Sequence, residues 1–293
     1  MLFDIVIQLL VFGVVLGGIY AFASLNLGLS WGLMHVVNFA NGEWIMLAMY
    51  STYWLSIIFH FDPYLLIPID ILIGIGVGSV LQWLVFEPVS KRGGGALMTI
   101  LSTFGISMLI IGLSQALWSQ TIYTLPNPYV STRIAVGSIS VSEAHLFAFL
   151  LSILAMLAVY LFLKKTRTGK AILATSEITG DPVAAGLMGV NTPRIRILSM
   201  ALSGATAGIA GAVIATFYYV YPSVGTTWSL IAFVVVILGG LGSFSGLLLG
   251  GIVVGVMEAM GNLLLGQAYG FILVYVVFLI VLYIRPRGFM GRV

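Results

Sequence analysis

The chain has 293 residues, of which 60% are hydrophobic and only 7% are charged. Ordinary soluble domains contain roughly 25% charged and 45–50% apolar residues, so this composition excludes a soluble globular protein and indicates a multi-pass membrane protein. The net charge is +3, and the absence of cysteine excludes disulfides and thiolate metal sites. The three histidines, His35, His60 and His145, do not have metal-ligand spacing, so no metal or other cofactor is expected.

The basic residues define the expected orientation. All twelve Lys and Arg residues except Arg133 lie in three short segments between apolar runs, at 87–95, 164–196 and 285–292. This clustering is typical of orientation signals and not of a nucleic-acid-binding surface. The positive-inside rule predicts that these segments and the C-terminus are cytoplasmic. The N-terminus is expected outside, because no basic residue precedes the first span.

The apolar runs predict an all-α bundle with eight or nine membrane crossings and broken or re-entrant helices, forming one domain over residues 1–293. The first span is interpreted as uncleaved, because its N-terminal region carries Asp4 and no basic residue. The polar segments 30–43 and 119–142 interrupt the pattern, and the second is expected outside. The expected helices cover residues 5–29, 44–59, 64–86, 97–118, 143–163, 197–220 and 270–284, with the run 228–260 divided by a glycine-rich break.

The basic segment 164–196 contains a predicted short helix. Asp181 is a suitable N-cap and Pro182 a suitable first residue, while Gly189 marks the end. The residues between them, including Leu187 and Met188, are almost all apolar, and a helix of about two turns is marginal alone in water. It is therefore expected either to fold back on this protein or the lipid headgroups, or to insert into a groove on a cytoplasmic partner.

Residues 38–43, Asn-Phe-Ala-Asn-Gly-Glu, form the most unusual stretch inside the apolar sequence. Polar side chains at membrane depth are costly unless they face protein or water. In one interpretation Asn41 caps the following helix and Glu43 favours its positive end. In the other, Asn38, Asn41 and Glu43 line a solute path. Asp70 and Glu258 are single acids within apolar runs, and either could be a packing partner for a hydroxyl or amide.

The glycine-rich break covers residues 239–246 and includes Gly239, Gly240 and Gly242. It lacks the Lys-Ser/Thr ending of a phosphate loop, so no nucleotide site is predicted. No histidine follows His145 to activate Ser243 or Ser245, so an intramembrane protease is not indicated. Irregular backbone at membrane depth is tolerated where it is buried or lines a cavity, so both tight packing and a pathway wall are consistent with this break.

These motifs together resemble the permease subunits of branched-chain amino acid ABC importers of bacteria and archaea. The resemblance covers nearly the whole chain and is carried by Asn-Phe-Ala-Asn-Gly-Glu at 38–43, Thr-Arg-Thr-Gly-Lys at 166–170, Ala-Ala-Gly-Leu-Met-Gly-Val-Asn at 184–191 and Gly-Gly-Leu-Gly-Ser at 239–243. The family pattern usually has His where Asn41 stands. The family also includes permeases for urea and short amides.

The resemblance implies a non-enzymatic transport subunit for Leu, Ile and Val that lies in the inner membrane of a prokaryote and binds no cofactor of its own. It would pair with a homologous second permease or with itself, two cytoplasmic ATPases that bind ATP would dock on 164–196, and an extracytoplasmic binding protein would deliver the solute. Residues 181–189 would be the coupling helix, with Arg167 and Lys170 orienting it or meeting the ATPase. The alternatives are a urea or short-amide permease, an ion-coupled secondary transporter using Glu43, Asp70 or Glu258, and a channel.

Overall fold

The computed structural model describes residues 2–34, 36–93, 95–136, 139–176, 180–266 and 269–291. The longer helices are α1 (Leu2–Ala23), α3 (Asn41–Phe59), α4 (Ile67–Leu81), α6 (Ala96–Trp118), α8 (Glu143–Lys165), α11 (Thr192–Ala215), α12 (Val224–Gly239), α13 (Phe244–Leu265) and α14 (Gly270–Ile284). The shorter elements are α2 (Leu25–Met34), a 3-10 turn (Pro63–Leu66), a π turn (Gln82–Phe86), α5 (Glu87–Lys91), α7 (Pro128–Ser131), β1 (Arg133–Val136), β2 (Ile139–Ser142), α9 (Arg167–Ala174) and α10 (Pro182–Leu187).

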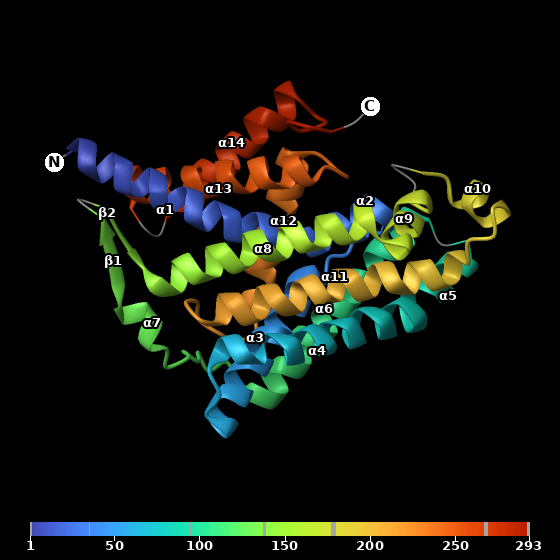
Figure 1. Cartoon of the computed structure of the whole chain (residues 1–293), viewed down its shortest axis with the longest axis horizontal. Helices are drawn as coiled ribbons and strands as arrows, with labels where there is room; N and C mark the ends of the chain where they lie inside the picture. Colours follow the sequence, from blue (N-terminus) through green and yellow to red (C-terminus); the bar gives the residue numbers. More distant parts are fainter. Residues whose placement is uncertain are drawn as a thin grey trace.

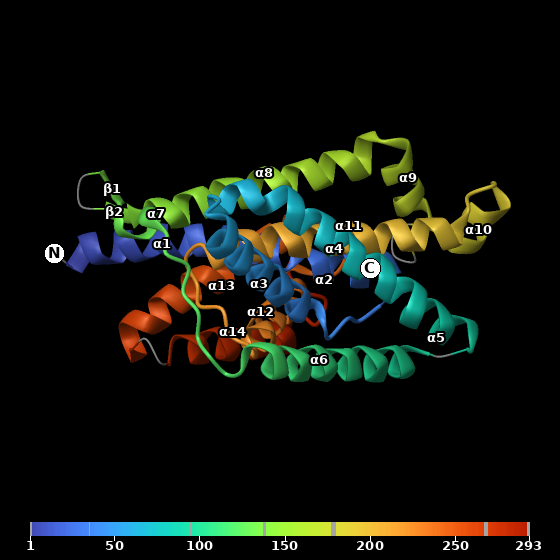
Figure 2. The ribbon, with the colours of Figure 1, turned by 90° about the horizontal axis from the view of Figure 1, so that it is seen from below.

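The long helices lie roughly along one axis, which gives the bundle two distinct ends (Figure 1). The start of α1, α7 and the β1–β2 hairpin lie at one end, which we call the N-terminal end. The loops after α5 and α8, with α9 and α10, lie at the other, which we call the basic end because it carries most of the Lys and Arg residues. Figure 2 shows α6 along one edge of the bundle, whereas α11 runs through its interior.

Six helical stretches among the described residues are long and apolar enough to cross a bilayer: Asp4–Ala23, Pro63–Lys91, Ala96–Trp118, Glu143–Lys165, Thr192–Ala215 and Phe244–Leu265. Two further apolar helices, α12 and α14, are shorter. The prediction of a polytopic helical membrane protein is therefore confirmed, while the number of crossings stays a prediction. In the most apolar stretch of α11, 72% of the residues are buried, whereas in that of α6 only 6% are buried. Helix α11 is therefore central and α6 is peripheral.

The predicted boundaries were wrong in three places. The first span is interrupted at Ser24, whose hydroxyl and N–H both donate to the Tyr20 carbonyl, at 2.6 and 2.9 Å, and α2 then continues to Met34. The third span is longer than predicted, since one helical stretch with an internal π turn runs from Pro63 to Lys91. The segment 119–142 contains an antiparallel hairpin in which Arg133 pairs with Ser142, so the fold is not purely helical.

Two pairs of helices approach at backbone distance through glycines four residues apart. A Cβ on Gly17 of α1 would lie 2.5 Å from the Ile252 Cα of α13, and one on Gly255 would meet the Gly13 carbonyl at 2.3 Å. In the second pair, α4 and α11, a Cβ on Gly74 would lie 2.1 Å from the carbonyl oxygen of Gly204. Small residues allow such close packing in membranes, so these glycine pairs serve intramolecular packing.

Candidate functional site

Residues 36–40, between α2 and α3, are irregular backbone inside the bundle, and side chains of distant helices bond to their backbone. The Phe39 N–H donates to the Thr103 hydroxyl of α6 at 3.2 Å, and that hydroxyl lies 3.3 Å from the Val37 carbonyl oxygen. The Ser229 hydroxyl of α12 donates to the Phe39 carbonyl at 3.3 Å. Irregular backbone at membrane depth is stable only with such partners. We call residues 36–43 with Thr103 and Ser229 the polar junction.

The first turn of α3 is capped from another helix. Ser229 accepts a hydrogen bond from the Gly42 N–H at 3.0 Å, although it lies 187 positions away in the sequence. The prediction that Asn41 caps α3 was wrong: the helix begins at Asn41, and the N-cap position is Ala40. The Asn41 amide instead donates to the Asn26 side chain at 3.3 Å, while the Asn26 amide donates to the Asn41 carbonyl at 3.0 Å. Asn41 therefore ties α3 to α2.

Glu43 lies in the first turn of α3 and is 1% exposed. The hydroxyls of Ser107 on α6 and Ser229 on α12 are its polar neighbours. Among the described residues, the Glu43 Oε2 atom, the Asn38 Nδ2 atom and the Asn41 Oδ1 atom are buried without a hydrogen-bond partner. Since buried polar groups are normally paired, this cluster can accept further polar groups. That Asn38, Asn41 and Glu43 line a solute path stays a prediction.

The glycine-rich break lies at the other end of α12. Gly240 has a φ of +90° and Gly242 a φ of +77°, so both adopt the left-handed backbone that glycine tolerates. A Cβ on Gly239 would lie 2.4 Å from the Gly246 carbonyl, and the Met290 N–H donates to the Gly239 carbonyl at 3.1 Å. The break is thus a tight turn closed by the segment after α14.

The structure separates the two predicted pathway groups. Asn38, Asn41 and Glu43 lie near Ser229, whereas Gly239 ends α12 about ten residues further on, roughly 15 Å away at 1.5 Å per residue. Gly240 and Gly242 follow in the turn after α12. The two groups do not form one site. The sequence interpretation missed Thr103, Ser107 and Ser229. Thr103, Ser107 and Ser114 follow helical spacing within one apolar run, and this pattern could have indicated a hydroxyl-bearing face.

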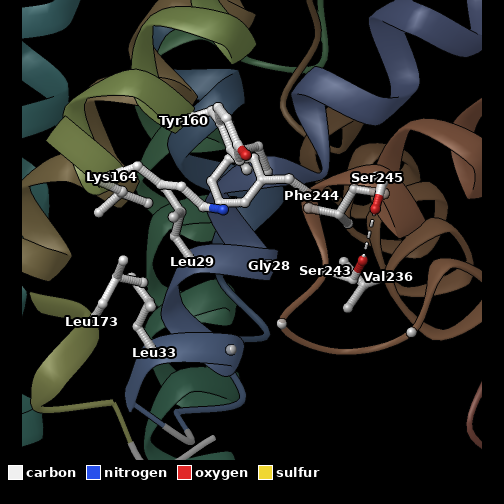
Figure 3. A pocket seen from close by; sticks show the side chains of 16 residues that line it. Gly28, Leu29, Leu33, Tyr160, Lys164, Leu173, Val236, Ser243, Phe244 and Ser245 are labelled. Carbon is white, nitrogen blue, oxygen red and sulfur yellow. Dashed lines mark hydrogen bonds between the residues drawn. The ribbon is translucent and has the colours of Figure 1, made fainter. Parts of the chain in front are cut away.

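A pocket of about 490 Å³ opens beside the glycine turn at the basic end (Figure 3). Its lining residues come from α2, from the end of α8, from α9 and from the α12–α13 turn. The Lys164 Nζ atom lies 5.0 Å from the centroid of the Tyr160 ring, and the Ser243 and Ser245 hydroxyls are 3.2 Å apart. Gly240 and Gly242 also line this pocket.

The predicted helix in the basic segment is present as α10. The Asp181 carboxylate accepts hydrogen bonds from the N–H groups of Val183 at 2.8 Å and Ala184 at 3.2 Å. At the other end, Gly189 has a φ of +89° and donates to the Gly186 carbonyl, while the Val190 N–H donates to the Ala185 carbonyl. These paired bonds form a Schellman motif. The predicted start at Asp181-Pro182 and stop at Gly189 are confirmed.

Most of the apolar surface of α10 is uncovered by the rest of the chain. Leu187 and Met188 are each 85% exposed and Val183 is 72% exposed, whereas Ala185 is buried. Figure 1 shows α10 at the tip of the basic end. Arg167 and Lys170 are exposed on the neighbouring α9, which is fixed by the buried side chain of Ile172. The structure thus places all seven predicted coupling residues at one end of the molecule.

The two single acids of the apolar helices have hydroxyl partners. The Thr52 hydroxyl donates to Asp70 Oδ2 at 2.8 Å, and the Tyr20 hydroxyl donates to Glu258 Oε2 at 2.6 Å. Both acids are therefore packing partners within the bundle, one of the roles expected for them. The residues that the structure describes include no group of three or more His, Cys, Asp or Glu side chains that could hold a metal ion.

A helical membrane bundle with a broken, hydrogen-bonded segment at its centre has the features of a membrane transport protein. The chain belongs to the family described as "Branched-chain amino acid transport system / permease component", whose model matches residues 9–282. This membership agrees with the resemblance seen in the sequence motifs.

Several curated relatives match over nearly their full length. The chain is 28% identical to the high-affinity branched-chain amino acid transport system permease protein BraD of Pseudomonas aeruginosa, over 98% of this chain and 96% of the relative. It is also 28% identical to LivH of Escherichia coli, with coverage of 96% and 94%, and to a probable LivH of Methanocaldococcus jannaschii, with coverage of 92% and 87%. The ribose import permease RbsC of Escherichia coli is 32% identical over only 39% of this chain. No solved structure matches significantly.

Proposed function

We propose that this chain is the permease subunit of an ABC importer that moves branched-chain amino acids into a prokaryotic cell. Family membership and the names of the full-length relatives support this proposal. In the proposed assembly, the chain pairs with a second permease and receives solute from an extracytoplasmic binding protein. Two cytoplasmic ATPases bind and hydrolyse ATP, so this chain needs no cofactor and performs no catalysis itself.

The observation that carries the proposal is the exposed apolar surface of α10. Leaving Leu187 and Met188 in water forgoes roughly 1.5 to 3 kcal/mol for each side chain that a partner groove could bury. Asp181, Pro182 and Gly189 fix the ends of the helix, so its shape is set before any partner binds. A preorganised helix loses less entropy on binding. We therefore propose that α10 docks in the ATPase, with Arg167 and Lys170 beside the contact.

We also propose that the basic end is cytoplasmic, by the positive-inside rule. Nine crossings then follow if α12, α14 and the segment 36–59 cross in addition to the six long stretches. An odd number places the N-terminus outside and the C-terminus inside. In this arrangement the polar junction lies within the membrane, where Asn38, Asn41 and Glu43 would line the solute path. Gly239, Gly240 and Gly242 would shape its cytoplasmic side.

Transport by purified components tests the proposal. The chain, its second permease and the ATPases would be reconstituted in liposomes, and leucine uptake would be measured with the binding protein present. We expect uptake that requires hydrolysable ATP and stops with a non-hydrolysable analogue. Uptake driven by an ion gradient without ATP would contradict the proposal. Competition by Ile and Val would support the branched-chain substrate class, whereas uptake of urea without uptake of leucine would identify a urea permease instead.

The docking helix is tested by replacing Leu187 and Met188 together with Asp. We expect loss of ATP-driven uptake and of co-purification with the ATPase, because two carboxylates cannot enter an apolar groove without a large desolvation cost. Membrane insertion should be unchanged, since no spanning helix is altered. Ile134→Asp is a matched control, because Ile134 is 47% exposed at the N-terminal end. Normal uptake in the double variant would contradict docking through α10.

A further inference from the structure

The pocket at the basic end lies beside α2, which follows α1 after the interruption at Ser24. Along most of its length α1 lies between α8 and α13 (Figure 1), where Gly18 packs on Phe149 and Gly17 on the backbone of Gly251. Beyond the break, α2 stays against the start of α13, where Gly28 packs on Leu247. The space between α2 and the end of α8 is left open as the pocket of about 490 Å³.

The inner wall of the pocket is apolar. One face of α2 supplies the side chains of Leu25, Leu29 and Leu33, which follow a spacing of four residues. Further apolar side chains come from the facing helices, namely Leu163, Leu173, Val236 and Leu247. A pocket of this size with such a lining is suited to a ligand with a substantial apolar part, and not to a small inorganic anion alone.

The rim of the pocket is polar and carries positive charge. Lys164 is exposed at the end of α8, and Figure 3 shows its amino group held across the mouth beside Tyr160 and Phe244. On the other side lie the hydroxyls of Ser243 and Ser245, at the start of α13. Ser243 accepts from the Gly246 N–H at 3.1 Å and so caps a helix whose positive end faces the rim. The rim therefore favours an anionic group with hydrogen-bond acceptors.

The position of the pocket indicates the source of such a ligand. It lies at the ends of α8 and α13, two helices long and apolar enough to span the membrane, and at the basic end of the bundle. Lysines and tyrosines in this position lie at the level of the lipid headgroups. A ligand that joins an anionic headgroup to an apolar chain is present there at high concentration.

We propose that this pocket binds an anionic phospholipid, with its phosphate between Lys164 and the two serine hydroxyls and an acyl chain along the leucine face of α2. Basic pockets between membrane helices recognise anionic headgroups in this manner. The bound lipid joins the end of α8, which leads into α9 and α10, to the α12–α13 turn. This inference does not depend on the solute that the protein carries.

Lipid titration with native mass spectrometry tests the site. The full-length chain would be purified in detergent and titrated with dioleoylphosphatidylglycerol or dioleoylphosphatidylcholine. We expect one copy of phosphatidylglycerol to bind in preference to phosphatidylcholine. Lys164→Gln should weaken the binding of that copy about fivefold, because one lysine near an anionic lipid contributes about 1 kcal/mol. Ser245→Trp, which fills the mouth from an exposed position, should weaken binding of the same copy.

Lys165→Gln is the matched control, because Lys165 is adjacent and exposed but does not line the pocket. Equal loss of phosphatidylglycerol binding in both lysine variants would show unspecific surface attraction and overturn the proposal. Displacement of the lipid by millimolar inorganic phosphate would identify a site for soluble anions, and displacement by millimolar leucine would identify a site for the solute; either result would also overturn the proposal. Equal binding of phosphatidylcholine would contradict the role of the rim charge.

Discussion

The polar junction and α10 both interrupt an apolar chain with a short irregular or helical segment, yet they are stabilised in opposite ways. At the junction, the backbone groups of Phe39 and Gly42 bond to side chains 64 and 187 positions away. In α10, the capping bonds join residues no more than five positions apart, from Asp181 to Val190. The first segment depends on distant helices, whereas the second is capped by its own neighbouring residues.

This difference separates the expected consequences of substitution. A change at the junction removes partners that the buried backbone cannot replace, so it should reduce folding stability and transport together. A change on α10 removes apolar surface that nothing in the described chain covers, so it should reduce coupling to a partner while the bundle remains stable. The predictions below test this separation, from the largest expected effect on stability to the smallest.

The largest effect is expected for Gly42→Leu. A Cβ on Gly42 would lie 1.9 Å from the carbonyl oxygen of Gly225, so α3 and α12 would have to separate. Overpacking of this kind should cost about 3 kcal/mol or more. We expect little monodisperse protein in detergent and a clearly lower melting temperature. Gly112→Leu is the control, because a Cβ on Gly112 meets nothing within 4 Å. Equal stability of the two variants would contradict the close approach.

A smaller effect is expected for Ser229→Ala. The Ser229 hydroxyl accepts from the Gly42 N–H and donates to the Phe39 carbonyl, so its loss leaves two buried backbone groups unpaired. Each such group costs about 1 to 3 kcal/mol. Thermal unfolding in detergent should show the loss, and leucine uptake should fall with it. Ser102→Ala is the control, because that hydroxyl is exposed and donates only within α6. Unchanged melting of the Ser229 variant would show that the junction does not depend on α12.

The sequence was sufficient to predict the local features of this protein. Asp181, Pro182 and Gly189 defined α10 because caps act within a few residues. The segment 38–43 was recognised as unusual, but its partners were not, because no local pattern connects Gly42 with Ser229 or Asn41 with Asn26. For this reason the interpretation of Asn41 as the cap of α3 was wrong. The break at Ser24 was also missed, since hydropathy is continuous across it, and with it the pocket beside Lys164.

A local effect is expected for Asp181→Ala. Loss of the N-cap should destabilise α10 by about 0.5 to 2 kcal/mol, while the melting temperature of the bundle stays the same because α10 projects from its end. ATP-driven uptake should fall in proportion to the folded fraction of α10. Asp181→Asn is the matched control, because asparagine caps about as well without the charge. If Asn and Ala reduce uptake equally, the charge of Asp181 and not its capping bond is what coupling requires.

Cross-linking from α10 tests the proposed coupling most directly. The chain contains no cysteine, so Met188→Cys introduces its single thiol. The Met188 side chain that it replaces is 85% exposed. A photoactivatable maleimide at this position, in membranes that contain the partner subunits, should cross-link to the ATPase, and the yield should change when ATP is added. The same probe at Ile134→Cys should give no ATPase adduct. No adduct from position 188, or an adduct only from position 134, would contradict docking through α10.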